Sequence, residues 1–126
     1  MHYFDHEKFI VYQRAIEFVE LADYALTNFP DGKAYLNDQL KRASSSIALN
    51  IAEGAGEFSP NDKKRFYRMA RRSATECAAI IDICDKFKLI KQSDKIKARE
   101  LLIHIVRMLT KLIKPSETGS NTEKEP

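Results

Sequence analysis

Residues 36–54 read LNDQLKRASSSIALNIAEG, and the spacing of the apolar side chains in this stretch decides the fold class. These side chains recur at intervals of four and three residues, which places them on one face of an α-helix. They are Leu36, Leu40, Ala43 and Ile47. Asn50 continues the face, and Gly54 and Gly56 follow where a glycine in the left-handed conformation commonly ends a helix. The stretch predicts a long helix that packs along other helices at shallow angles.

Two more helices are predicted near the ends of the chain. The first covers residues 11–29 and stops at the turn signal formed by Pro30 and Gly32. Its apolar face contains Val11, Ala15, Phe18, Ala22, Ala25 and Phe29. The last begins near Ser93 and is expected to end where Pro115 interrupts it.

A further helix follows the quoted stretch. Ser59 is suited to be its N-cap and Pro60 to occupy its first position. Its apolar stripe is predicted to contain Phe66, Ala70, Ser73, Cys77, Ile80, Cys84 and Phe87. Short connections make successive helices antiparallel neighbours, so we expect an all-α, up-down-up-down four-helix bundle over residues 1–114. Residues 115–126 contain no apolar side chain and are predicted to form a disordered polar tail.

The composition agrees with one helical domain. The chain has 126 residues, 44% hydrophobic and 31% charged, with only four glycines and four prolines. So few turn-forming residues argue against a sandwich or barrel of many short strands. No apolar run reaches the ~20 residues that a membrane-spanning helix needs, and the N-terminus lacks the features of a signal peptide. We therefore expect a cytoplasmic protein with no membrane partner.

The residue types that carry catalysis are not gathered in this sequence. Cys77 and Cys84 lie seven residues apart on one helix, so their Cα atoms would be ~10 Å apart, too far for a disulfide. His2, His6 and His104 have no further ligands at metal-binding spacing. No glycine-rich phosphate loop and no nucleophile with a nearby base is present. The sequence predicts a non-enzymatic protein without metal or cofactor.

Charge is distributed unevenly along the chain. Residues 1–30 hold two basic and five acidic residues, whereas residues 59–75 hold six basic residues and one acidic residue. Most of these basic residues share one face of the third helix, namely Lys64, Arg65, Arg68, Arg71 and Arg72. This face is either a solvated surface or, together with Lys41, a binding site for the RNA or DNA backbone. Tyr67 beside Arg71 could stack on an unpaired base.

The second helix indicates self-association. Its outward positions are small or apolar where a monomer would carry lysine and glutamate, and we predict an oligomer interface at Ser45, Ala48, Leu49 and Ala52. The acidic first helix could also meet the basic face of a neighbouring copy. Such a head-to-tail contact closes into a ring or continues as a filament.

Three polar residues fall on or beside the apolar stripes. Asn50, Glu53 and Glu76 should pair with one another or with the backbone around Gly54 and Gly56, because unpaired buried polar groups are costly. A structural polar network that fixes helix register is favoured over a catalytic role.

Several motifs in order resemble a known family. Residues 39–54 resemble the "QLRRAA-SI-NIAEG" signature of the four-helix-bundle family encoded in intervening sequences of bacterial 23S ribosomal RNA genes. Residues 59–76 and 11–15 are similar to its "S…RF…A-GS-E" and "VWQKA" segments. Members resemble the accessory variability determinant of diversity-generating retroelements, a homopentameric barrel that binds nucleic acid and a reverse transcriptase. The resemblance implies a ring-forming, non-enzymatic bundle.

Two functions therefore stay open. The first is a cytoplasmic homo-oligomer, pentameric by resemblance, that binds the RNA or DNA backbone through the basic face of the third helix. The alternative is a protein-docking accessory module, for example for the reverse transcriptase of a retroelement, in which the same cations hold a protein partner.

Overall fold

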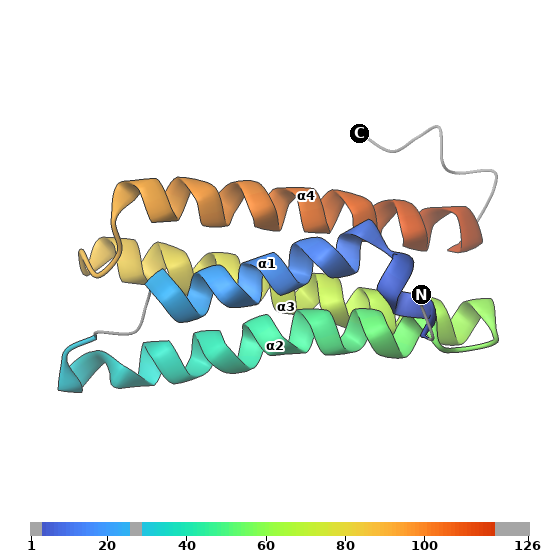
Figure 1. Cartoon of the computed structure of the whole chain (residues 1–126), viewed down its shortest axis with the longest axis horizontal. Coiled ribbons are helices and arrows are strands. Elements are labelled where there is room, and N and C mark those ends of the chain that lie inside the picture. Colours follow the sequence, from blue (N-terminus) through green and yellow to red (C-terminus); the bar gives the residue numbers. More distant parts are fainter. Residues whose placement is uncertain (1–3, 26–28, 118–126) are drawn as a thin grey trace.

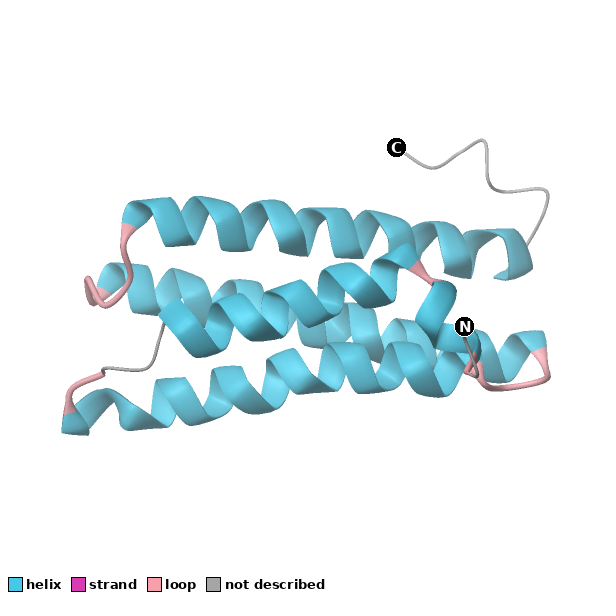
Figure 2. Ribbon diagram, in the orientation of Figure 1, coloured by secondary structure: helices cyan, strands magenta, loops and turns pink. Residues whose placement is uncertain are grey.

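The computed structural model describes residues 4–25 and 29–117, and four long helices account for most of them (Figure 1). They are α1 (Ile10–Ala25), α2 (Ala34–Ala55), α3 (Pro60–Lys86) and α4 (Gln92–Glu117). Two short 3-10 helices, η1 (Asp5–Lys8) and η2 (Asp31–Lys33), precede α1 and α2. Figure 2 shows these helices joined by short loops, with no strand in the described part. The prediction of an all-helical chain with four long helices is confirmed.

Successive helices run in opposite directions. Polar pairs join α2 to α3 and α3 to α4, namely Arg42–Glu76 and Ser46–Ser73 in the first case, and Arg71–Thr110 and Asp85–Lys95 in the second. In both sets, as the residue number rises along one helix, the number of its partner on the other helix falls. This is the pattern of antiparallel helices. Figure 1 shows α1 and α3 running from right to left and α2 and α4 from left to right.

All four helices contribute to one hydrophobic core. Each helix packs against the next in the chain, and α4 also packs against α1. The largest fully buried side chains include Phe18, Leu36, Leu40, Ile47, Ile51, Ile81, Ile105, Leu109 and Ile113. On α1 the buried residues are Val11, Ala15, Phe18 and Ala22, all on the predicted face. Burial of apolar surface at ~25 cal/mol per Å² is the main force that holds the bundle together.

The apolar stripe of α3 differs in part from the prediction. Ala70, Cys77, Ile80 and Cys84 are buried as predicted. Phe66 and Ser73 are only half-buried and Phe87 is exposed, while Tyr67 and Ala74 are buried instead. The reason is that α3 packs against both α2 and α4, so its buried arc is wide and is turned toward α4 by about one residue.

The end of α2 is closely packed against α3. Gly54 lies inside the helix and is buried, and a Cβ atom added there would lie 2.6 Å from Cε1 of Tyr67. Gly56 is the C-cap with φ −86°, so the predicted left-handed glycine is wrong. The Lys63 ammonium instead donates to the carbonyls of Gly54 and Ala55, at 3.4 and 3.0 Å. The lysine side chain thus satisfies the carbonyl of Ala55 and adds to the backbone bond that Glu57 donates to Gly54.

The start of α3 agrees with the predicted N-cap. The backbone N–H of Asp62 donates to Oγ of Ser59 at 3.0 Å, and Pro60 occupies the first turn, where a missing N–H costs nothing. At the same end of the bundle α4 continues through Pro115 to Glu117, so the predicted helix end at Pro115 is wrong. A proline in the last turn removes only one backbone hydrogen bond.

The rest of the predicted tail, residues 118–126, lies outside the described residues. Among the helices that are described, none combines the length and the hydropathy needed to cross a membrane.

Candidate nucleic-acid interface

The exposed ridge of α3 carries three arginines. Arg65 and Arg72 are exposed and Arg68 is half-buried, at spacings of three and four residues along the helix. The guanidinium of Arg65 lies over the ring of Phe66, 4.5 Å from its centroid. This contact holds Arg65 in an ordered position on the surface, because the face of an aromatic ring attracts a cation.

Two other predicted residues lie on the side of α3 that faces α4. Lys64 is only 8% exposed, so its assignment to an open basic surface is wrong. Lys64 lies two helical turns before Arg71 and therefore on the same side of α3. Arg71 is half-buried and donates from Nη1 to Oγ1 of Thr110 at 3.2 Å. The hydroxyl accepts without neutralising the charge of Arg71. This bond ties the ridge of α3 to the C-terminal half of α4.

Lys41 is separated from the α3 residues. It is exposed and lines a groove between α1 and α2 whose other walls include Glu20 and Asp23. Its nearest charged surroundings are therefore acidic, and the structure does not bring Lys41 into the basic face with which it was predicted to act.

The C-terminal half of α4 adds basic residues that the sequence analysis missed. Arg107 and Lys111 are exposed and Lys114 is half-buried, and residues 101–114 contain no acidic residue. The bond between Arg71 and Thr110 places this half of α4 beside the basic half of α3. These three basic residues are four and three positions apart with no acidic residue between them, and this pattern could have predicted a basic face on α4.

Together these side chains form a basic surface across two helices. We define it by Arg65, Arg68, Arg71, Arg72, Arg107, Lys111 and Lys114. Residues 63–75 and 101–114, the segments that carry it, contain no acidic residue.

Tyr67 is not part of this surface. Its side chain is 3% exposed and packs against the end of α2, and burial raises the pKa of its hydroxyl, with the negative charge of Asp5 adding to the effect. The prediction that Tyr67 stacks on a base is therefore wrong.

The polar residues near the α2–α3 contact pair differently from the prediction. Asn50 donates from Nδ2 to the carbonyl and hydroxyl oxygens of Ser46, at 2.9 and 3.0 Å. The hydroxyl of Ser46 shares a hydrogen bond with that of Ser73 on α3 at 2.9 Å. Glu53 is exposed and lies outside this chain of bonds.

Glu76 forms an ion pair with Arg42 of α2, and not with the arginines of its own helix. Both side chains are substantially exposed, so the pair fixes the register of α2 against α3 more than it stabilises the fold. One acidic group next to the basic surface is thereby neutralised by a cation from another helix.

Three of the four predicted interface residues are accessible. Leu49 is 65% exposed, Ser45 is exposed at the groove between α1 and α2, and Ala52 is half-buried beside η1. Ala48 is 5% exposed and belongs to the core, so its prediction as an outward residue is wrong. It lies on the edge of the helix that packs within the bundle.

The comparisons with known proteins decide the family. The family model described as "23S rRNA-intervening sequence protein" matches residues 7–111. The chain belongs to this family. Comparison with curated proteins gives no match.

A solved structure has the same fold. It is a protein of unknown function from the S23 ribosomal protein family of Bacteroides thetaiotaomicron VPI-5482, with a TM-score of 0.70 at 19% sequence identity. The alignment covers 83% of the present chain and 99% of that protein.

The signature of the 23S rRNA-intervening sequence proteins has a structural explanation in this chain. Residues 39–54 form the part of α2 that contacts α3, including Ser46 and Arg42, whose partners are Ser73 and Glu76. Gly54 ends the signature where a Cβ atom would collide with a buried ring. These residues position α3 and its arginines on the bundle.

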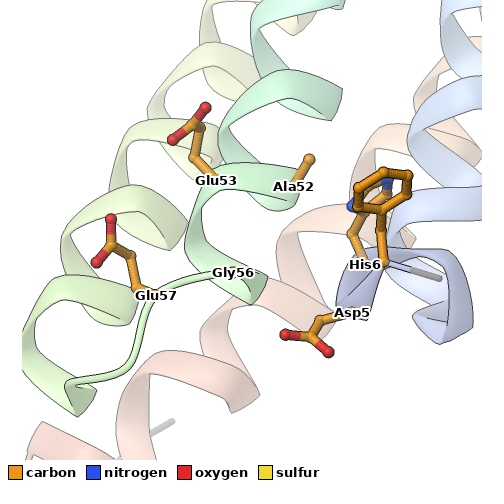
Figure 3. Close-up of a pocket in the computed structure, with 7 residues that line it drawn as sticks. Asp5, His6, Ala52, Glu53, Gly56 and Glu57 are labelled. Carbon is orange, nitrogen blue, oxygen red and sulfur yellow. The ribbon is translucent and has the colours of Figure 1, made fainter.

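A pocket near the end of α2 contains acidic residues but no convergent site. It is lined by η1 and the α2–α3 turn, and Figure 3 shows Glu53 and Glu57 projecting away from Asp5 and His6. Within residues 4–25 and 29–117, no group of three or more histidine, cysteine or acidic side chains could hold a metal ion. The pocket supplies no arrangement for metal-assisted chemistry.

Both cysteines are buried and unpaired. Burial raises the pKa of the Cys77 thiol to about 12, with a further increase from Glu76 and an opposing effect from Arg42. Burial also raises the pKa of the Cys84 thiol to about 11. Both therefore stay protonated at neutral pH, which is unfavourable for a nucleophile because the thiolate is the reactive form.

Proposed function

We propose that the protein is a cytoplasmic, non-enzymatic homo-oligomer that binds the phosphate backbone of RNA or DNA through the basic surface of α3 and α4. The observation that carries this proposal is the set of seven cationic side chains on two neighbouring helix halves. The segments that carry them contain no acidic residue.

Such a surface attracts anionic ligands. Its positive charges repel one another, and salt screens this repulsion over a Debye length of about 8 Å at physiological ionic strength. Phosphates would offset the repulsion, and each phosphate contact would release counterions from the nucleic acid. A surface that served only for solubility would mix both signs of charge.

Binding should depend on the ridge arginines. We expect the double variant Arg68→Glu/Arg72→Glu to lose at least tenfold in affinity for a labelled oligonucleotide, measured by fluorescence anisotropy at ~100 mM salt. The matched control is Lys91→Glu/Lys97→Glu, which makes the same change of charge at exposed positions beside the α1–α4 grooves. Equal affinities of the two variants would show that the basic surface is not the binding site.

The outer face of α2 supports self-association. An exposed leucine between small side chains allows another helix to approach closely, and the family resemblance implies five copies in a ring. We expect Leu49→Arg to reduce the oligomer mass measured by light scattering. Ile96→Arg is the control, because Ile96 is 57% exposed on α4, far from this face in sequence and on another helix.

A protein-docking function is the second candidate, and one observation favours it. A groove between α3 and α4 has an apolar floor that includes Ala78, Ile103 and Val106, with Arg99 and Arg107 also among its walls. This combination suits an amphipathic segment with acidic residues, such as part of a reverse transcriptase. Docking is the correct function if the parent protein does not bind nucleic acid and captures a protein partner, and if Ile103→Asp abolishes this capture.

A further inference from the structure

We infer that the basic surface recognises double-stranded nucleic acid in preference to single strands. This inference rests on the proposed function and specifies the ligand class of the same surface. It is carried by the arrangement of the cations in two rows.

The two rows follow the two helices. The α3 row is Arg65, Arg68 and Arg72, and the α4 row is Arg107, Lys111 and Lys114. The first and last residues of each row are seven positions apart, which is ~10 Å along a helix axis. Arg71 lies between the rows, and its bond to Thr110 keeps the two helix halves in this register.

The density of positive charge matches that of a duplex. Double-stranded DNA carries one negative charge per ~1.7 Å of its axis, and each strand one per ~3.4 Å. Over ~10 Å a duplex therefore presents about six phosphates and one strand about three. The two rows together hold six cations, so a single strand would leave about half of them without a phosphate.

The width of the surface leads to the same conclusion. Packed helices have axes ~8–10 Å apart, and the basic side chains extend outward from them. This separation is close to the ~12 Å width of the major groove of DNA, so each row can contact the phosphates of a different strand. One strand could follow only one row at a time.

None of the seven residues that define the surface is aromatic, and the exposed Phe58 lies in the loop before α3, outside the two rows. Proteins that bind single strands combine a basic groove with aromatic side chains on which bases stack. Tyr67 is buried, and Phe66 is half-buried with the Arg65 guanidinium over its ring. Tyr67 therefore cannot stack on a base, and the Arg65 guanidinium occupies one face of Phe66.

Fluorescence anisotropy of the full chain with three probes tests the inference. The probes are a 20-base-pair DNA duplex, an RNA duplex of the same length and an unstructured 20-nucleotide oligo(U), each titrated between 50 and 250 mM salt. We expect log–log salt slopes of about −5 on the duplexes and about −2 on the single strand, with at least tenfold tighter duplex binding at the lowest salt. Either duplex supports the inference, and equal or tighter binding of oligo(U) overturns it. Binding of no probe would refute the proposed function itself.

A variant of the α4 row tests the two-row geometry. Arg107→Gln/Lys111→Gln should reduce the magnitude of the duplex slope by about 2 and change oligo(U) affinity less than twofold. Lys91→Gln/Lys97→Gln is the matched control and should leave both probes unchanged. An equal loss on oligo(U) and duplex would show that one row binds both ligands. All four side chains are exposed, and circular dichroism would verify that the helices are retained.

Discussion

Replacing Gly54 with alanine should destabilise the bundle, although alanine is the better helix former. Gly54 lies inside α2, where alanine would ordinarily improve stability by about 1 kcal/mol. The added Cβ would lie 2.6 Å from Cε1 and 2.9 Å from Cδ1 of Tyr67, and 3.1 Å from Cβ of Phe66. Carbon atoms do not approach this closely, so the ring or the helix must move.

The two effects have opposite signs, and the steric one should prevail. Inserting a methyl group into a packed core typically costs about 1–3 kcal/mol. The ring of Tyr67 is buried and cannot swing into solvent, so the upper part of this range applies. Subtracting the gain in helix propensity leaves a net loss of about 1–2 kcal/mol in the free energy of unfolding.

Urea denaturation followed by circular dichroism measures this loss. With a urea m-value of about 2 kcal/mol/M, the midpoint should fall by about 0.5–1 M. Gly56→Ala is the matched control, because its added Cβ has no neighbour closer than 3.6 Å and its φ of −86° suits alanine. This variant should be neutral or slightly stabilised.

A double variant identifies the cause. In a Tyr67→Leu background the ring is gone and the 3.1 Å approach to Cβ of Phe66 remains, so Gly54→Ala should lose most of its destabilising effect. If Gly54→Ala stabilises the parent protein, or if its effect is the same in both backgrounds, the close approach of α2 and α3 does not explain this glycine.

Three further predictions follow from local geometry. Cys77 and Cys84 should react with a thiol reagent at pH 8 only after denaturation, because burial raises both pKa values; rapid labelling of the native protein would contradict this. The hydrogen bond from Lys95, and next the one from the Gln92 amide, lower the pKa of Asp85 below 3.8 in the folded protein. The ionised Asp85 therefore stabilises the fold above pH 3.8, and this stabilisation is lost as the pH falls through the pKa of the folded state. Asp85→Asn should show a shallower loss of stability below pH 4 in acid titration, and an unchanged profile would refute the assignment. Ser59→Ala should cost about 1 kcal/mol in urea denaturation, and no change would show that the N-cap bond contributes nothing.

The helices could be predicted from the sequence, but their neighbours could not. Apolar spacing locates a helix and its buried side to within about one residue. The spacing does not reveal which neighbouring helix covers a given side chain. For this reason Lys64 and Tyr67 were predicted to be accessible, although both are buried, Tyr67 against the end of α2. The same limitation hid Arg107, because its part in the basic surface depends on the register of α3 against α4.

The polar pairs depend on tertiary geometry in the same way. Asn50 satisfies its amide on Ser46 within its own helix, a bond that the four-residue spacing permits. Glu76 has arginines near it along the chain, but it pairs with Arg42 across the α2–α3 contact. The predicted pairing of Glu76 with Asn50, Glu53 or the backbone near Gly54 is therefore wrong, because the facing helix supplies a cation that spacing along the chain does not reveal.

The short link between α2 and α3 also has a consequence for how the chain folds. Only residues 56–59 separate these helices, and they make the most extensive contact in the bundle. Closing so short a loop loses little chain entropy, and contacts between residues near in sequence form fast. We therefore expect the α2–α3 hairpin to be the nucleus of folding. The arginine ridge of α3 would then already be displayed before α1 and α4 complete the core.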